Sequence, residues 1–152
     1  TAKELQLFTN LFPIEDKRIT SEVCVHHLSF CDEDYESLNT LIQCNPAIKT
    51  REDRNALWHA LLDDRLDIIA TDHAPHTWEE KQLPYGQAPS GLPLVQHSLQ
   101  LMLQHVTNGR LSLEKMVEKM CHAPARCFQL QERGYMREGY WADLVLVDPT
   151  KK

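Results

Sequence analysis

Hydrophobic positions recur along the chain at helical spacing in several segments. Leu5, Phe8, Leu11 and Phe12 predict a helix over 3–12 that ends before Pro13. Thr50 and Asp53 resemble a capping box ahead of a second helix. Further helices are predicted over 95–106, from Ser112 onward, and from Pro124 to about Gln131.

Four short apolar stretches predict strands between these helices. They are "ITSEVCVHHL" (19–28), ending near His26; "LNTLIQCNP" (38–46), ending in a turn at Asn45-Pro46; "LDIIATD" (66–72); and "YWADLVLVDP" (140–149). Residues 66–72 are apolar at successive rather than alternate positions, which is typical of a parallel strand covered on both faces. The segment 73–91 has no periodicity and is rich in Pro and Gly, so a long functional loop is expected there.

The alternation of strands and helices predicts the α/β class, built from parallel βαβ units. In such folds the loops that leave the carboxyl ends of the strands carry the chemistry. His26, Asn45 and Asp72 all fall at predicted strand ends. These three positions are therefore the first candidates for a functional site.

Composition narrows the class of protein. The 152 residues are 42% hydrophobic and 25% charged, which is ordinary globular composition, and the formal net charge of −6 argues against a nucleic-acid partner. No run of 18 apolar residues predicts a membrane span. The five cysteines form no CxxC pair, so reduced thiols in a cytoplasmic protein are expected.

The densest candidate chemistry follows the apolar stretch at 66–72. Asp72 can serve as an oxygen ligand or general base, and His73 and His76 as nitrogen ligands or proton carriers. The simpler alternative for Asp72 is a turn cap. Because adjacent side chains usually point apart, His73 has a weaker case than His76, which Pro75 stiffens in place. Gly91 permits close approach of the backbone to a ligand, or is a plain turn.

Several longer strings carry a family resemblance. "IATDHAPHT" ahead of "EEK", together with "PSGLPLVQ", resembles dihydroorotase of the amidohydrolase superfamily. "SEVCVHHL" is similar to the family's Glu-Val-Thr-Pro-His-His-Leu, with Cys24-Val25 in place of Thr-Pro. "NPAIKTRED", "HAPARCF" (with His122-Ala123 where Asn usually stands) and "REGYWADLVLVDP" also resemble family segments.

The resemblance implies a distorted (β/α)8 barrel with a small β-sandwich. A full barrel needs roughly 250 residues, so the expectation is a C-terminal half-barrel over 1–132, followed over 133–152 by a strand that returns to the sandwich. The remainder of the same barrel would then be a partner, the fragment alone would be inactive, and the enzyme would form a homo-oligomer.

The implied activity is the interconversion of dihydroorotate and N-carbamoyl-L-aspartate in pyrimidine biosynthesis, with one or two zinc ions. By this resemblance Asp72 is both metal ligand and proton shuttle, while His26 and His27 lie near the site but outside the first metal shell, and His73 has no assigned role. The implied substrate-binding residues are Asn45, His76, Pro89, Ser90 and Gly91. Two alternatives stay open: an allantoinase or hydantoinase type of cyclic amidase, and a non-catalytic dihydroorotase-like scaffold subunit.

Overall fold

The computed structural model describes residues 1–149, so the last three positions of the predicted domain 133–152 lie outside the described part. Its strands are β1 (Glu22–Cys24) and β2 (Ile68–Ala70). Its α-helices are α1 (Val25–Ser29), α2 (Tyr35–Leu38), α3 (Arg51–Leu62), α4 (Trp78–Lys81), α5 (Ser98–Thr107), α6 (Leu113–Val117) and α7 (Ala123–Cys127). Short 3₁₀ turns are η1 (Glu4–Leu7), η2 (Ile14–Asp16), η3 (Asp32–Asp34) and η4 (Asn39–Ile42), and η5 (Glu118–His122) is a π-helical turn.

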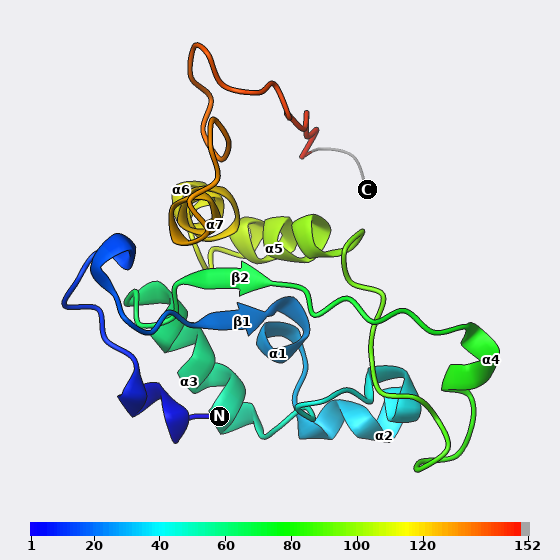
Figure 1. The fold of residues 1–152 in the computed structure, drawn as a ribbon. Coiled ribbons are helices and arrows are strands. Elements are labelled where there is room, and N and C mark those ends of the chain that lie inside the picture. Colours follow the sequence, from blue (N-terminus) through cyan, green and yellow to red (C-terminus); the bar gives the residue numbers. More distant parts are fainter. Residues whose placement is uncertain (150–152) are drawn as a thin grey trace.

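The two strands confirm the predicted parallel pairing. β1 and β2 run parallel with Val23 opposite Ile69, and an isolated parallel bridge between His73 and Leu92 extends the arrangement past β2. Ile68 and Ile69 point to opposite faces and both are buried, in two separate apolar clusters. In Figure 1 the strands lie between α5, α6 and α7 on one side and α1 and α3 on the other.

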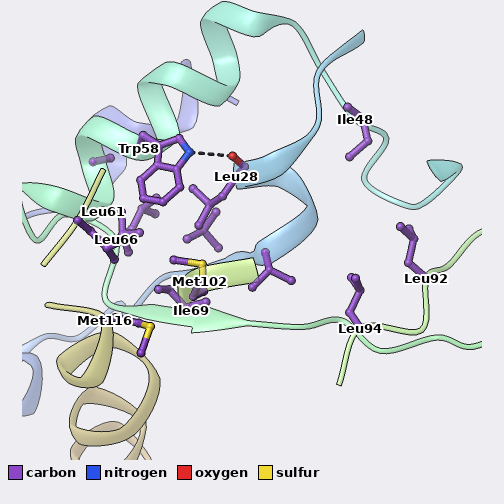
Figure 2. Packing of buried hydrophobic residues seen from close by; sticks show 14 of the residues in the cluster. Leu28, Ile48, Trp58, Leu61, Leu66, Ile69, Leu92, Leu94, Met102 and Met116 are labelled. Carbon is purple, nitrogen blue, oxygen red and sulfur yellow. Dashed lines mark hydrogen bonds between the residues drawn. The ribbon is translucent and has the colours of Figure 1, made fainter. Parts of the chain in front are cut away.

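Most of the core lies around β1, α1, α3 and α5. Leu28, Leu61 and Met102 are fully buried there (Figure 2). The indole Nε1 of Trp58 donates to the carbonyl of Leu28 at 2.7 Å, which satisfies its polar atom inside the core and ties α3 to α1. As predicted, Thr50 caps α3, and its hydroxyl accepts from the amide of Asp53.

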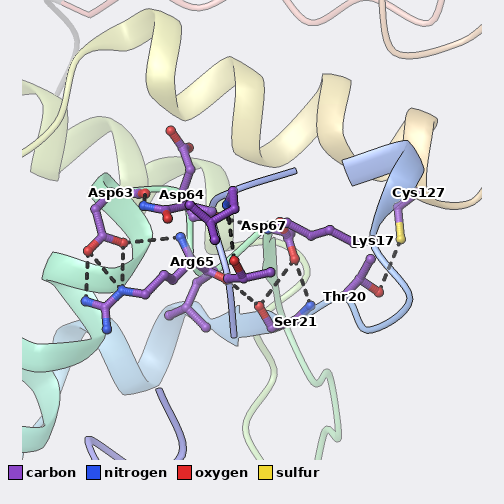
Figure 3. A network of polar contacts seen from close by, with 12 residues as sticks. Lys17, Thr20, Ser21, Asp63, Asp64, Arg65, Asp67 and Cys127 are labelled. Atoms are coloured by element: carbon purple, nitrogen blue, oxygen red, sulfur yellow. Dashed lines mark hydrogen bonds and ion pairs between the residues drawn. The ribbon is translucent and has the colours of Figure 1, made fainter. Parts of the chain in front are cut away.

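A buried polar network holds the amino ends of both strands. The Lys17 ammonium pairs with Asp67 at 2.5 Å, and their side chains are only 3% and 5% exposed. Asp67 also accepts from the amide of Ser21 at 3.0 Å, which links the residue before β1 to the residue before β2 (Figure 3). This network therefore fixes the register of the pair at the end away from the carboxyl-end loops.

Two predictions near the amino terminus are wrong in their detail. The helix over 3–12 is reduced to the short turn η1, because Leu5 reaches the core while Leu11 is 82% exposed. A stable helix packs a continuous apolar face against a partner. Leu5 and Phe8 pack against the core cluster, but none of the described residues after Phe8 in this segment does. The predicted strand 19–28 is also shorter and covers only Glu22–Cys24. Because α1 begins at Val25, His26 lies in a helix and not at the end of the strand.

The segment 38–46 is not a strand. Thr40, Ile42 and Cys44 are buried at alternate positions, which explains the strand-like pattern, but the backbone turns as η4 and pairs with no described strand. The predicted loop 73–91 contains the helix α4, which Thr77 and Glu80 cap reciprocally. The helix predicted from Pro124 to Gln131 ends at Cys127.

The segment 140–149 forms no strand in the described part of the chain, contrary to prediction. It lies apart from the strands and helices in Figure 1, and Leu146 is fully exposed. A strand needs a neighbour to accept its backbone hydrogen bonds along its length. Among the described residues the segment joins no sheet, and the Trp141 amide donates to the carbonyl of Glu132 at 3.0 Å without extending into a ladder. In the described residues no helix is long and apolar enough to cross a membrane.

Candidate active site

Asp72 lies two residues beyond the carboxyl end of β2. Its φ of +47° lies in the left-handed region, where the chain turns out of the strand direction. The carboxylate is exposed, and among the described residues no donor is hydrogen-bonded to it. An acceptor-only group that faces solvent without a protein partner is free to bind a ligand.

Asp72 and Asn45 share one pocket, as the sequence predicts for two site residues. The pocket has a volume of about 430 Å³ and lies between the end of β1, the segment 45–50 and the first turns of α3. Its charged lining residues are Glu22, Lys49, Asp53, Arg54 and Asp72, with the imidazole of His27 and the thiol of Cys24 beside them. The mixture of acidic and basic groups suits a small polar molecule.

His76 and the turn at 89–91 form a second group of predicted residues in mutual contact. The His76 Nε2 lies 3.2 Å from the carbonyl of Ser90. A Cβ added to Gly91, whose φ is +143°, would lie 2.5 Å from Ala74 and 3.2 Å from the same imidazole nitrogen. Only glycine permits this close approach of the two arms of the loop.

Among the predicted site residues, Asn45 connects the two groups. Besides the first pocket, it lines a second one of about 360 Å³, together with Ser90, Gln43, Tyr35 and Tyr85. The structure does not place His76, Pro89 or Gly91 on the wall of either pocket. The predicted residues thus divide into a pocket with Asp72 and a loop beside it, and the roles proposed for them stay predictions.

His73 has a backbone partner of its own. Its Nδ1 accepts from the amide of Val95 at 3.1 Å, and its backbone forms the isolated bridge to Leu92. Through these two contacts, His73 holds residues 92–95, which follow the loop, against the start of the loop. This is a structural role.

Cys24, His26 and His27 lie close together at the junction of β1 and α1. Their ligand atoms are all within 4.8 Å of one another. The environment favours neutral imidazoles, which is the form that binds metals, but it disfavours the thiolate of Cys24. Burial raises the pKa of the Cys24 thiol to about 12, with Asp72 adding to the effect, and thiolate rather than thiol binds metals. Burial lowers the pKa of His27, whose Nε2 lies 2.8 Å from the carbonyl of Pro46.

Burial also lowers the pKa of His26 to about 4, with neighbouring His27 as a smaller cause. This side chain is fully buried, and neither ring nitrogen has a hydrogen-bond partner in the described residues. His26 therefore belongs to the core rather than to the pocket.

The donors around the pocket fit a divalent metal in kind. Zinc takes carboxylate, imidazole and thiolate ligands, and its catalytic sites use three protein ligands with one position open. Asp72 supplies an open carboxylate, and further ligands are needed beyond it. The amidohydrolase chemistry expected from the sequence is metal-dependent, and this carboxylate is compatible with it.

Lys81, at the end of α4, is a residue that the sequence analysis missed. It is 6% exposed, and its ammonium donates to three carbonyls, those of Gln43, Pro89 and Gly91, at 2.9–3.0 Å. In the sequence it stands in "TWEEKQ", where the polar neighbours predict a solvated position. Its hydrophobic pattern does not distinguish it from a surface lysine, although it ends the "EEK" string that follows "IATDHAPHT".

The arrangement of parallel strands with a polar pocket at their carboxyl ends is that of a TIM-barrel metallohydrolase. The sequence profile of the Amidohydrolase family matches residues 14–152, and the chain belongs to that family.

Curated dihydroorotases are among the relatives of this chain. The enzyme of Bacillus subtilis is 42% identical over 136 residues, which is 89% of this chain and 32% of that protein. The dihydroorotase of Halobacterium salinarum is 42% identical over 130 residues, 86% of this chain and 31% of that protein. The chain thus spans about a third of the length of these relatives.

Solved structures show the same fold. The L-hydantoinase (dihydropyrimidinase) of Arthrobacter aurescens superposes with a TM-score of 0.81 at 26% identity, covering 93% of this chain and 32% of that one. The dihydroorotase of Saccharomyces cerevisiae in complex with 5-fluoroorotic acid gives a TM-score of 0.76 at 18% identity, covering 86% and 36%. At 18% identity the second likeness concerns the fold alone.

Proposed function

We propose that this chain is the C-terminal part of a dihydroorotase, which interconverts dihydroorotate and N-carbamoyl-L-aspartate. The observation that carries the proposal is the 42% identity to the Bacillus subtilis dihydroorotase over 89% of this chain. Further support comes from the carboxylate of Asp72 and the amide of Asn45, which line the same pocket. The reaction opens or closes a cyclic amide in a small anionic substrate.

Asp72 is the proposed catalytic and metal-binding residue. One or two zinc ions, bound by Asp72 together with ligands from outside the described residues, would supply Lewis-acid chemistry at the ring carbonyl. Asp72 itself takes a proton from the attacking water and delivers it to the ring nitrogen as the amide bond breaks. Its exposed carboxylate at the end of β2 has the freedom to face both groups.

The remaining site residues bind the substrate. The Asn45 amide and the His76 imidazole hold the substrate carboxylate and ring, and main-chain groups from Pro89 to Gly91 complete the binding surface. A hydrogen bond to a charged acceptor is worth about 1.5–3 kcal/mol, so these contacts fix the orientation of the ring. In this proposal the chain contributes the C-terminal part of the barrel over 1–132, the segment 133–152 belongs to the β-sandwich, and the complete enzyme is a homo-oligomer.

A hydantoinase-type amidase is the second candidate, and one observation favours it. The Arthrobacter aurescens L-hydantoinase superposes with a TM-score of 0.81 at 26% identity. The Ala-Pro-His sequence after His73 favours dihydroorotase or allantoinase instead. The two reactions share the ring opening and differ in the group that the binding residues hold.

An assay of the full-length protein that carries this chain decides between the candidates. Purified with its metal, it should turn over dihydroorotate with a kcat/KM at least ~10²-fold above that for hydantoin or allantoin, because a site built for a carboxylate rejects substrates that lack it. Metal analysis of the same sample should find one or two zinc ions per chain. Faster turnover of hydantoin would refute the dihydroorotase assignment, and no turnover of any cyclic amide would favour the scaffold alternative.

A further inference from the structure

The ammonium of Lys81 sits in a cage made only of backbone carbonyls. Its Nζ donates to Gln43 at 3.0 Å, to Pro89 at 2.9 Å and to Gly91 at 3.0 Å. An ammonium has three N–H donors and no acceptor, so donors and acceptors match in number.

The charge state of Lys81 follows from this geometry. Burial lowers the pKa of this lysine, but a neutral amine would direct its lone pair at one of three carbonyl oxygens. All three hydrogen bonds of Nζ go to backbone carbonyls and none to a carboxylate, so peptide dipoles hold the positive charge. Burying a cation costs desolvation free energy, and the three hydrogen bonds of Nζ offset that cost.

The three carbonyls belong to two segments that carry proposed substrate-binding residues. Gln43 lies two positions before Asn45, and Pro89 and Gly91 flank Ser90. The same segments also meet directly, since the amide of Gly91 donates to the carbonyl of Gln43 at 2.9 Å and the Gln43 side chain donates to the carbonyl of Ala88 at 2.9 Å. Thr40 anchors Lys81 in turn, its hydroxyl donating to the Lys81 carbonyl at 2.7 Å.

We propose that Lys81 is a positioning residue that locks the turn 89–91 against the segment 43–45, so that the two substrate-binding segments keep one fixed separation. The inference rests on the proposed function of Asn45 and of the turn 89–91. Lys81 does not contact the substrate. It sets the backbone of the residues that do.

The test compares two lysine-to-alanine variants in the full-length protein. Lys81→Ala should raise the KM for dihydroorotate by roughly tenfold or more, equivalent to about 1.4 kcal/mol or more of lost binding, while kcat falls less. Lys119→Ala is the control, because Lys119 is also buried (3% exposed) and donates to a backbone carbonyl, that of Leu66 at 2.7 Å, but near the amino end of β2. Unlike Lys81, it also pairs with a carboxylate, that of Asp64 at 2.8 Å. Lys119→Ala should lower stability and leave KM unchanged.

A rescue experiment separates positioning from a general structural role. The n-propylammonium ion carries the atoms that Lys81→Ala deletes, so adding it should return the KM of that variant toward the wild-type value. The same concentration of tetramethylammonium, which has no N–H donor, should not. A wild-type KM in Lys81→Ala would overturn the proposal, as would an equal KM increase in Lys119→Ala.

Hydrogen exchange keeps this proposal separable from the proposed function. The Gly91 amide should exchange faster in Lys81→Ala than in Lys119→Ala, whichever cyclic amide the enzyme uses. If the wild type acts on hydantoin rather than dihydroorotate, the dihydroorotase assignment fails and the KM comparison is made with hydantoin. Should Lys81→Ala not fold, Lys81→Gln, which keeps two donors, should fold with an intermediate exchange rate at Gly91. Unchanged exchange there would refute the positioning role.

Discussion

Asp72 and His26 each follow a strand within two residues, but their environments differ greatly. Asp72 is exposed two residues beyond the end of β2, whereas His26 is fully buried in the first turn of α1, two residues beyond the end of β1. At the residue scale, this difference in solvation decides which side chain is available for chemistry. The exposed carboxylate can reach a ligand, whereas burial lowers the pKa of His26 to about 4 and favours its neutral imidazole.

Replacing Asp72 by Asn tests its proposed role directly. In the full-length protein, Asp72→Asn should lower kcat by at least ~10²-fold, because general acid–base transfer alone contributes about 10²–10⁴. Circular dichroism should show an unchanged fold, since the carboxylate is exposed and makes no hydrogen bond within the described residues. Turnover near the wild-type rate at neutral pH would mean that Asp72 only turns the chain.

His26 predicts a pH dependence of stability. Its pKa falls from 6.5 to about 4 in the folded protein, so between these values the unfolded chain binds more protons than the folded one. The free energy of unfolding is therefore unaffected by His26 above pH 6.5. As the pH falls toward 4, protonation of His26 in the unfolded chain lowers it by up to about 3 kcal/mol. His26→Leu should flatten the fall of the unfolding temperature between pH 7 and 4.5.

The exposed His59 provides the control for that measurement. His59→Leu should leave the pH profile as it is in the wild type, because an exposed imidazole keeps its contact with water. An unaltered profile in His26→Leu would show that His26 does not cause the acid sensitivity.

At the scale of elements, the loop 73–91 is a folded structure rather than a flexible connection. α4 divides it, the Thr77–Glu80 capping box fixes the start of that helix, and Lys81 bonds the returning arm to the end of α4. The two arms meet where Gly91 faces Ala74. A loop with this many internal contacts can present binding groups at fixed positions.

Gly91→Ala should disrupt this loop more than the same change at Gly86. Both glycines have positive φ, but a Cβ at Gly91 would lie 2.5 Å from the Cβ and carbonyl of Ala74, whereas a Cβ at Gly86 meets nothing within 4 Å. We expect kcat/KM for the full-length protein to fall at least ~10-fold with Gly91→Ala. Gly86→Ala should cost only the backbone strain, about 1–2 kcal/mol of stability. Equal effects of the two changes would contradict the close approach.

At the scale of the whole molecule, apolar surface remains open on several sides. Leu146 and Leu11 are strongly exposed, and β1 pairs with β2 alone among the described residues. Large exposed apolar groups and free strand edges are typical of surfaces that another segment covers. This agrees with a chain that spans 32% of the length of its Bacillus subtilis relative.

The isolated 152-residue chain should therefore be inactive. Asp72 is one proposed ligand, and catalytic zinc sites use three protein ligands. Turnover of dihydroorotate and bound zinc would be measured on the purified chain, with the full-length protein as positive control. Stoichiometric zinc together with turnover in the isolated chain would contradict the proposal that the other metal ligands lie outside these 152 residues.

The sequence by itself determined the parallel pair of strands, the capped helix α3 and the placement of Asp72. These features depend on local pattern: two successive buried isoleucines require cover on both faces of a strand, and Thr50 needs only the next turn of its own helix to form a cap. The string around Asp72 was specific enough to predict the family as well.

Tertiary structure decided the features that depend on distant partners. The alternation at Thr40, Ile42 and Cys44 is that of a strand, but no described segment offers it a ladder, so the backbone turns instead. The apolar residues of 140–149 likewise have no strand to pair with among the described residues. Lys81 looks like a surface lysine in sequence, and only the return of residues 89–91 onto Gln43 encloses its ammonium within three carbonyls. A hydrogen-bond partner supplied by a remote segment leaves no trace in local periodicity, because periodicity records which side chains are buried and not what they meet.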